Sequence, residues 1–190
     1  TENLSEKTKT AHMELYQNYI KALNRISAEL DTADRKNVAS SGCMYRSLKG
    51  DEVFNHNAVY LHELYFANSS DVHSEIMMDS LAYMRLARDF GSFEDFQFDF
   101  IASSLSSRNG WSCCGFSMYL KRYMNIFIDS HNVGIPFGFV PVIILDMHEH
   151  AYRDYLNDRS GYVIGQMREF NWTIVEERIK RCEKILEIMK

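Results

Sequence analysis

The chain has 190 residues, enough for one domain or for two small lobes that share a core. Apolar residues make up 46% and aromatic residues 13% of it, which argues against a disordered, collagen-like or low-complexity chain. Lys and Arg number 21 against 26 Asp and Glu, and the formal net charge of −5 argues against a nucleic-acid partner. The longest apolar run, 137–145, is interrupted by Gly138 and Pro141 and is too short to span a bilayer, so we expect no membrane partner.

The cysteines indicate the compartment. Cys43, Cys113, Cys114 and Cys182 form no CxxC pair and suggest no disulfide framework. If Cys113 and Cys114 lie in a strand, their side chains point to opposite faces. No charged-then-apolar leader opens the sequence as given. We therefore expect four reduced thiols and a cytoplasmic location.

The first half of the chain is predicted to be helical. Ser5 is a good N-cap, and apolar residues repeat at three- and four-residue spacing as far as Leu30. A polar connection follows, and Ser70 or Asp71 and then Ser92 are expected to cap later helices. The predicted helices cover residues 5–30, 52–66, 72–90 and 92–107.

After a turn at 108–110 the pattern changes to aromatic and branched residues, which favour strands. The strands are expected at 111–120, 123–128 and 140–145, with a turn at Lys121 and Arg122. The chain looks helical again from His148 and ends in an amphipathic helix over 172–189. The predicted fold class is α+β, with a helical lobe over 1–90 and an α/β lobe with a small antiparallel sheet over 91–190.

One segment carries residue types that bind metals. Asp146 and His150 lie four residues apart where a strand should end, so both side chains could point to one centre. A carboxylate and an imidazole together suit iron, manganese or zinc. The alternative is a polar helix start at which Asp146 is a cap and the histidines are solvated.

Two further histidines lie on predicted helices. His12 and His62 both have apolar neighbours, and a lone histidine in such a place is more often a core residue than a ligand. Facing helices are nevertheless a common source of metal ligands. Spacing alone does not choose His12 and His62 over His56 or His73.

Motifs along nearly the whole chain resemble one family. Residues 146–152, DMHEHAY, resemble the D-x-W-E-H-A-Y motif of the iron/manganese superoxide dismutases. Residues 53–66 are similar to the family's second-helix motif, and residues 4–12 to the start of its first long helix. Further landmarks follow in the family's order: GSFEDF at 91–96, GW at 110–111 and NW at 171–172.

This resemblance implies a helical hairpin followed by a lobe with a three-stranded antiparallel sheet flanked by helices. One iron or manganese ion per subunit would lie between them, bound by three His, one Asp and a solvent molecule. The implied ligands are His12, His62, Asp146 and His150.

The resemblance also implies roles around the metal. His131 stands where one subgroup places a donor to the bound solvent, and Val133 where many manganese members have Gln, so iron is the preferred metal. Tyr19 resembles the gateway Tyr of the substrate channel. Glu149 resembles a carboxylate that pairs with a ligand His across a subunit interface, which implies a homodimer or tetramer. The alternatives are that His131 is a surface histidine, Tyr19 an ordinary core tyrosine and Glu149 a surface carboxylate.

Several positions depart from the family pattern. Tyr19 follows His12 by one residue fewer than usual, which rotates it by about 100° on a helix. His148 replaces the motif Trp, and Cys113 stands where another Trp is usual. Arg153 stands where the family commonly has a Tyr. The first-helix His that pairs with this Tyr across the subunit interface is also missing. We expect a roomier, more polar pocket.

Three functions are consistent with these features. The first is a superoxide dismutase, an antioxidant oxidoreductase that converts superoxide to dioxygen and hydrogen peroxide. The second is a divergent metalloenzyme that uses the same ligands on a different oxidative or hydrolytic substrate. The third is a non-catalytic structural or partner-binding protein, against which the retained ligand types argue, because unpaired buried His and Asp are costly.

Overall fold

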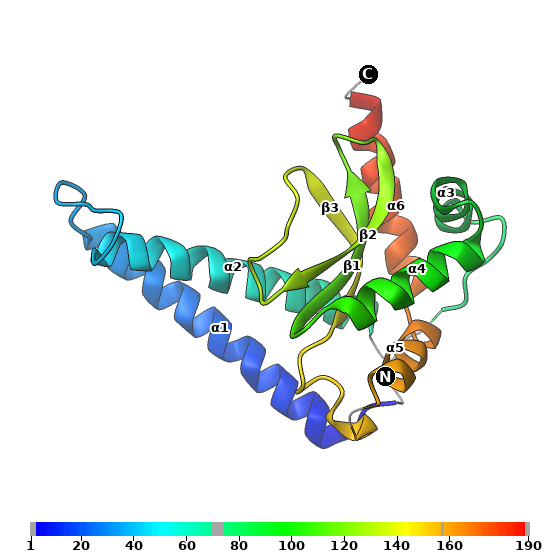
Figure 1. Cartoon of the computed structure of the whole chain (residues 1–190), viewed down its shortest axis with the longest axis horizontal. Helices are drawn as coiled ribbons and strands as arrows, with labels where there is room; N and C mark the ends of the chain where they lie inside the picture. The colour runs from blue at the N-terminus through cyan, green and yellow to red at the C-terminus, as the bar shows by residue number, and fades with distance from the viewer. Residues whose placement is uncertain (1–2, 70–73, 157, 189–190) are drawn as a thin grey trace.

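The computed structural model describes residues 3–69, 74–156 and 158–188 and has the predicted α+β architecture (Figure 1). The described elements in chain order are α1 (Glu6–Thr32), α2 (Met44–Asn68), α3 (Leu81–Phe90), α4 (Phe93–Ser106), β1 (Gly110–Ser117), β2 (Arg122–Asp129), β3 (Phe139–Asp146), the 3-10 helix η1 (Arg153–Tyr155), α5 (Arg159–Arg168) and α6 (Trp172–Ile188).

Helices α1 and α2 form a long hairpin that extends away from the rest of the molecule (Figure 1). As predicted, the Ser5 side chain caps α1 by accepting a hydrogen bond from the Thr8 N–H. The Ser5 N–H and hydroxyl donate in turn to Asp154, at 2.7 and 2.9 Å. The start of α1 is therefore fixed to η1, near the end of β3.

The three strands form an antiparallel sheet in the order β2-β1-β3. Trp111 pairs with Ile128 on one side and with Asp146 on the other. Helix α4 packs against β1 and β2, and α2 and α6 pack against β3. The last residue of β3, Asp146, is thereby fully buried close to α2.

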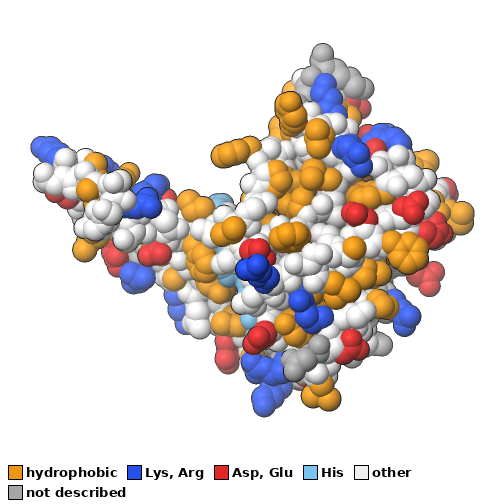
Figure 2. Space-filling model, viewed as in Figure 1, with side chains coloured by type: hydrophobic (Ala, Val, Ile, Leu, Met, Phe, Trp, Pro, Cys, Tyr) orange, Lys and Arg blue, Asp and Glu red, His pale blue; other side chains and the backbone are white. Residues whose placement is uncertain are grey.

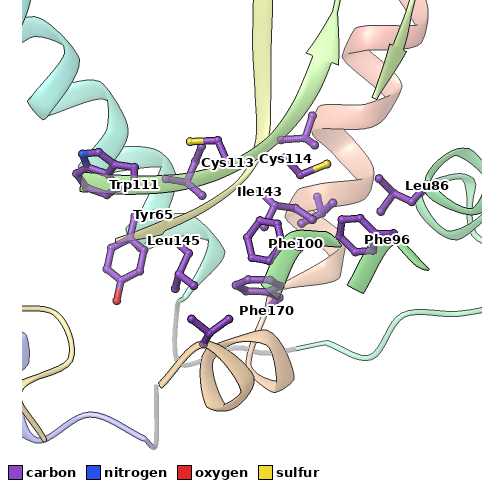
Figure 3. Close-up of a cluster of buried hydrophobic side chains, with 14 of the residues drawn as sticks. Tyr65, Leu86, Phe96, Phe100, Trp111, Cys113, Cys114, Ile143, Leu145 and Phe170 are labelled. Atoms are coloured by element: carbon purple, nitrogen blue, oxygen red, sulfur yellow. The ribbon is translucent and has the colours of Figure 1, made fainter. Parts of the chain in front are cut away.

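The main core fills the space between the sheet and the helices that cover it (Figure 3). The side chains of Cys113 and Cys114 lie on opposite sides of β1, and both are buried. All four cysteines are free, as predicted. No helix in the described ranges combines the length and the apolar character needed to cross a membrane.

Arg178 connects the elements that carry the candidate ligands. From α6 its guanidinium donates to the Leu64 carbonyl on α2 and to the Val142 carbonyl on β3, each at 3.0 Å, and to the Asn68 side chain at 2.7 Å. Burial lowers the pKa of Arg178 to about 10, which still leaves the side chain charged at neutral pH. The three hydrogen bonds fix α2 against β3, so that His62 and Asp146 keep their separation.

Some predicted boundaries were wrong. The helix expected over 72–90 begins only at Leu81, because Ser74 instead forms a β-bridge with Asn171. Residues 70–73, which include the proposed caps and His73, lie outside the described residues. Helix α2 begins at Met44 rather than 52, since Leu48 packs against α1. The β1–β2 turn ends at Lys121, so Arg122 already belongs to β2.

The segment after β3 is also not the predicted helix. The Asp146 side chain accepts the His148 N–H at 2.8 Å, which closes a tight turn before η1 begins. The division into lobes at 1–90 and 91–190 stays a prediction. Helix α3 belongs to the first predicted lobe, but it packs against α4, α6 and β2, which belong to the second.

Gly110 is expected to be essential for the sheet. A Cβ at this position would lie 1.9 Å from the Ile128 carbonyl oxygen and 2.8 Å from the Ser130 nitrogen, both backbone atoms. We expect Gly110→Ala to lower the free energy of unfolding by about 1–3 kcal/mol, measured by urea denaturation. Gly50→Ala is the matched control, because the space around Gly50 on α2 is open and Ala favours helix. Equal stability of Gly110→Ala and the native chain would contradict this account.

Candidate metal centre

Four side chains from distant parts of the sequence meet where the hairpin joins the lobe. His12 comes from α1, His62 from α2, Asp146 from the end of β3 and His150 from the turn that follows. Their ligand atoms all lie within 4.8 Å of one another, and three of the four residues are buried. Histidine surface is visible at this junction in Figure 2 (pale blue). The group could hold one metal ion.

The His62 ring is oriented by its own helix. Its Nδ1 lies 2.6 Å from the Ala58 carbonyl oxygen, which only accepts, so Nδ1 carries the proton. In the neutral ring Nε2 then has a free lone pair. Burial lowers the pKa of His62 to about 4, so the ring is neutral at neutral pH. A neutral ring whose other nitrogen bonds to a carbonyl is the usual state of a metal-binding histidine.

The buried atoms of the group fit a metal ion. His12 Nε2 and His62 Nε2 are both buried and have no hydrogen-bond partner. His12 Nε2 lies 2.9 Å from Asp146 Oδ2, but off the hydrogen-bonding direction. His150 Nε2 lies 3.1 Å from the same oxygen. Unpaired buried nitrogens are costly, and three imidazoles with one carboxylate form a donor set that suits iron, manganese or zinc.

Asp146 is ionised in this environment. Burial alone raises the pKa of its carboxyl, but its contacts with His12, His148 and His150 outweigh that effect and hold the pKa well below the usual range. The carboxylate therefore provides a negative charge at the centre of the group. Such a charge stabilises a bound cation.

Beside this group lies a hydrogen-bonded chain of three side chains. Trp111 Nε1, which can only donate, is 2.9 Å from His131 Nδ1, so the neutral His131 ring carries its proton on Nε2. That nitrogen is 3.0 Å from the Tyr19 hydroxyl oxygen and therefore donates to it. The Tyr19 ring centroid lies 5.4 Å from that of His62. The hydroxyl proton of Tyr19 is left to point elsewhere.

Comparison with known proteins identifies the family of the chain. The family model "Iron/manganese superoxide dismutases, C-terminal domain" matches residues 79–178. The iron superoxide dismutase of Aquifex aeolicus is 31% identical over the whole chain and 90% of the relative. The chain belongs to the iron/manganese superoxide dismutase family. The iron superoxide dismutase of Cupriavidus metallidurans is 34% identical over 89% of the chain and 85% of the relative. Manganese superoxide dismutase 1 of Halobacterium salinarum is 28% identical over 97% of the chain and 91% of the relative.

The relatives carry either metal in their names, so membership of the iron/manganese superoxide dismutase family does not choose between iron and manganese. The predicted candidate ligands His12, His62, Asp146 and His150 do come together. His56, the open alternative on α2, is exposed and lies apart from them. Tyr19 and His131 lie beside the group and bond to each other. Glu149 is exposed.

Three positions that differ from the superoxide dismutase motifs are accommodated in the structure. Despite its shorter spacing from His12, Tyr19 reaches His131. The His148 ring packs against Trp111 and His131, with centroids 5.6 and 5.0 Å apart, and so occupies space next to the candidate ligands. Cys113 is fully buried, and burial raises the pKa of its thiol, so little of it is the reactive thiolate.

The partner of His131 was not identified from the sequence. In the sequence Trp111 is only part of the GW landmark at 110–111, yet in the structure its indole N–H fixes the His131 tautomer. The sequence marks Trp111 only by its position at the start of a predicted strand, next to a glycine. The two residues are 20 positions apart in the sequence, and that separation gives no indication of the contact.

Acid is expected to destabilise the metal-free protein. Burial lowers the pKa of His131 to about 3, below its ordinary value of 6.5. Between these two pH values the unfolded chain binds a proton that the folded chain does not, so the free energy of unfolding falls as pH falls. The slope approaches about 1.4 kcal/mol per pH unit for one such group. Urea denaturation between pH 7 and pH 4 measures it, and His131→Asn should show a shallower slope. An unchanged slope in the variant would contradict this expectation.

Proposed function

We propose that the protein is a superoxide dismutase that converts two superoxide anions and two protons to dioxygen and hydrogen peroxide. The observation that carries this proposal is the group of three imidazoles and one carboxylate with two unpaired buried nitrogens. His12, His62, Asp146 and His150 would hold one iron or manganese ion. When bound, that ion supplies the one-electron oxidation and reduction that the reaction needs.

Tyr19 is proposed to present a proton to the reacting oxygen species. Burial and the charge of Asp146 raise the pKa of Tyr19, so the phenol keeps its proton at neutral pH. Because His131 Nε2–H already donates to the Tyr19 oxygen, the Tyr19 O–H is available as a donor. Trp111 in turn keeps His131 in the tautomer that this arrangement requires.

Iron is the proposed metal. Small changes in the hydrogen bonds around a metal centre set its potential, and the buried His131 stands where the resemblance places a donor to the metal-bound solvent. Val133 is 55% exposed and has no polar side-chain atom, so it supplies no equivalent contact. The four free thiols favour the cytoplasm as the compartment of this antioxidant activity.

The active unit is proposed to be a homodimer or a tetramer built from such dimers. The His150 side chain is 20% exposed although it belongs to the candidate centre, and the adjacent Glu149 is exposed. A second copy that covers this surface would enclose His150 and give Glu149 an imidazole partner. We expect the native protein to sediment as a dimer or larger, and Glu149→Lys to raise the dimer dissociation constant tenfold or more, about 1.4 kcal/mol. Glu177→Lys on α6 is the control, and equal sedimentation of both variants would contradict the proposed interface.

Stopped-flow measurement of superoxide decay tests the proposed function. Protein loaded separately with iron and with manganese is assayed, and the metal content of each sample is quantified. Rapid decay in proportion to bound iron is the expected result. Full occupancy with either metal and no acceleration would exclude dismutation and would favour a different oxidative or hydrolytic substrate for the same centre.

A further inference from the structure

His148 lies between two candidate ligands both in sequence and in space. Its ring stacks on that of His150, with centroids 5.3 Å apart and planes 13° apart. The residue is only 9% exposed, so its side chain points into the protein rather than into solvent. Nothing in the proposed reaction uses this imidazole.

The polar contacts of His148 converge on a single atom. Its backbone N–H donates to Asp146 Oδ1 at 2.8 Å, and its side-chain Nδ1 lies 2.7 Å from the same oxygen. An ionised carboxylate only accepts, so Nδ1 carries the proton and donates. One residue therefore gives Oδ1 two hydrogen bonds.

The two oxygens of Asp146 consequently have different surroundings. Oδ1 accepts from His148, whereas Oδ2 faces Nε2 of both His12 and His150, at 2.9 and 3.1 Å. The carboxylate is fully buried, so bulk solvent does not compete for these contacts. Its orientation is set by the donors on Oδ1.

We propose that His148 is a positioning residue. Its Nδ1–H holds Asp146 so that Oδ2 is the metal-binding oxygen. The same hydrogen bond reduces the negative charge that the carboxylate presents to the metal. The inference rests on the proposed metal centre but not on the identity of the substrate. The indole that the family motif has at this position carries its N–H one atom further from Cβ, so this donor is a property of the imidazole in this chain.

The tautomer of His148 can be observed in the native protein. In metal-free protein with ¹⁵N-labelled histidine, long-range ¹H–¹⁵N correlation spectra should show His148 with its proton on Nδ1. A His148 ring that carries its proton on Nε2 alone would overturn the proposal. This test does not depend on any variant that must fold.

Two variants separate the donor from the shape of the ring. His148→Phe keeps a flat ring but has carbon in place of Nδ1, whereas His148→Asn retains an N–H at the corresponding position. We expect manganese(II) affinity, measured by chelator competition, to fall about 10- to 100-fold in His148→Phe and to stay near the native value in His148→Asn. The reduction potential of the iron-loaded protein should fall in His148→Phe, because a more negative carboxylate favours the oxidised ion. In His148→Asn the potential should be close to that of the native protein. His56→Phe, at an exposed position on α2, is the control.

The outcomes are distinct from those of the dismutation assay, since neither affinity nor potential requires superoxide. Loss in His148→Phe together with retention in His148→Asn supports the proposal. Native affinity and potential in His148→Phe would overturn it. Equal loss in both variants would also overturn it, because the shape of the ring rather than its donor would then be responsible.

Discussion

His62→Ala is expected to bind iron and manganese weakly and to lose superoxide dismutation, whereas His56→Ala keeps both. The two histidines lie on the same helix, but only His62 has a buried, unpaired Nε2 directed at Asp146 and His12. Removal of a direct ligand should cost more than the 10- to 100-fold loss typical of outer hydrogen-bond partners. Metal content after dialysis and superoxide decay per chain measure the two effects.

Asp146→Ala should also lose the bound metal. This substitution removes the only carboxylate of the group and leaves the rings of His12, His148 and His150 without their shared partner. We expect metal binding to be lost and the metal-free protein to be destabilised by about 1–3 kcal/mol, because the two buried N–H donors of His148 lose their acceptor. Asp79→Ala, at an exposed position, is the control. Native metal content in either His62→Ala or Asp146→Ala would contradict the proposed ligand set.

The second large effect is expected from the chain of hydrogen bonds that ends at Tyr19. His131→Ala leaves Trp111 Nε1 without its acceptor and Tyr19 without its donor, although it removes no candidate ligand. We expect dismutation per bound metal ion to fall about 10- to 100-fold while metal content is retained. Stopped-flow decay normalised to bound metal measures the effect.

Two tyrosines on α1 provide a matched test of that chain. Tyr19→Phe removes the hydroxyl next to His131 and should also lower dismutation per bound ion. Tyr16→Phe removes a hydroxyl that donates to the exposed Glu63 at 2.9 Å, and should leave dismutation unchanged. Equal rates in the two variants would show that the contact between Tyr19 and His131 has no part in the reaction.

Much of the fold follows from local sequence. Helix α1 was predicted because Ser5 caps it and apolar residues repeat along one side. The strands were predicted because aromatic and branched residues cluster between turn residues. The first turns of α2 were missed because their few apolar residues gain their partners only when α2 packs against α1. The turn after β3 was misread because it is made by the Asp146 side chain, a contact that helical periodicity does not describe.

The candidate centre could be predicted only in part. The four-residue spacing predicted that Asp146 and His150 point to one centre. Spacing did not distinguish His12 and His62 from the other histidines. The resemblance to a family supplied that choice. Contacts between elements, such as Trp111 with His131 and His148 with Asp146, depend on strand register and on turn geometry. Residue types alone do not encode them.

A titration of iron into metal-free protein tests whether an ion bound by these four side chains carries dismutation. Bound iron and the rate constant for superoxide decay are measured at each addition, for the native protein and for Asp146→Ala. Both quantities should rise together in the native protein and reach a plateau at one ion per chain, and neither should rise in the variant. Saturation of binding without faster superoxide decay, or fast decay in Asp146→Ala, would contradict this prediction.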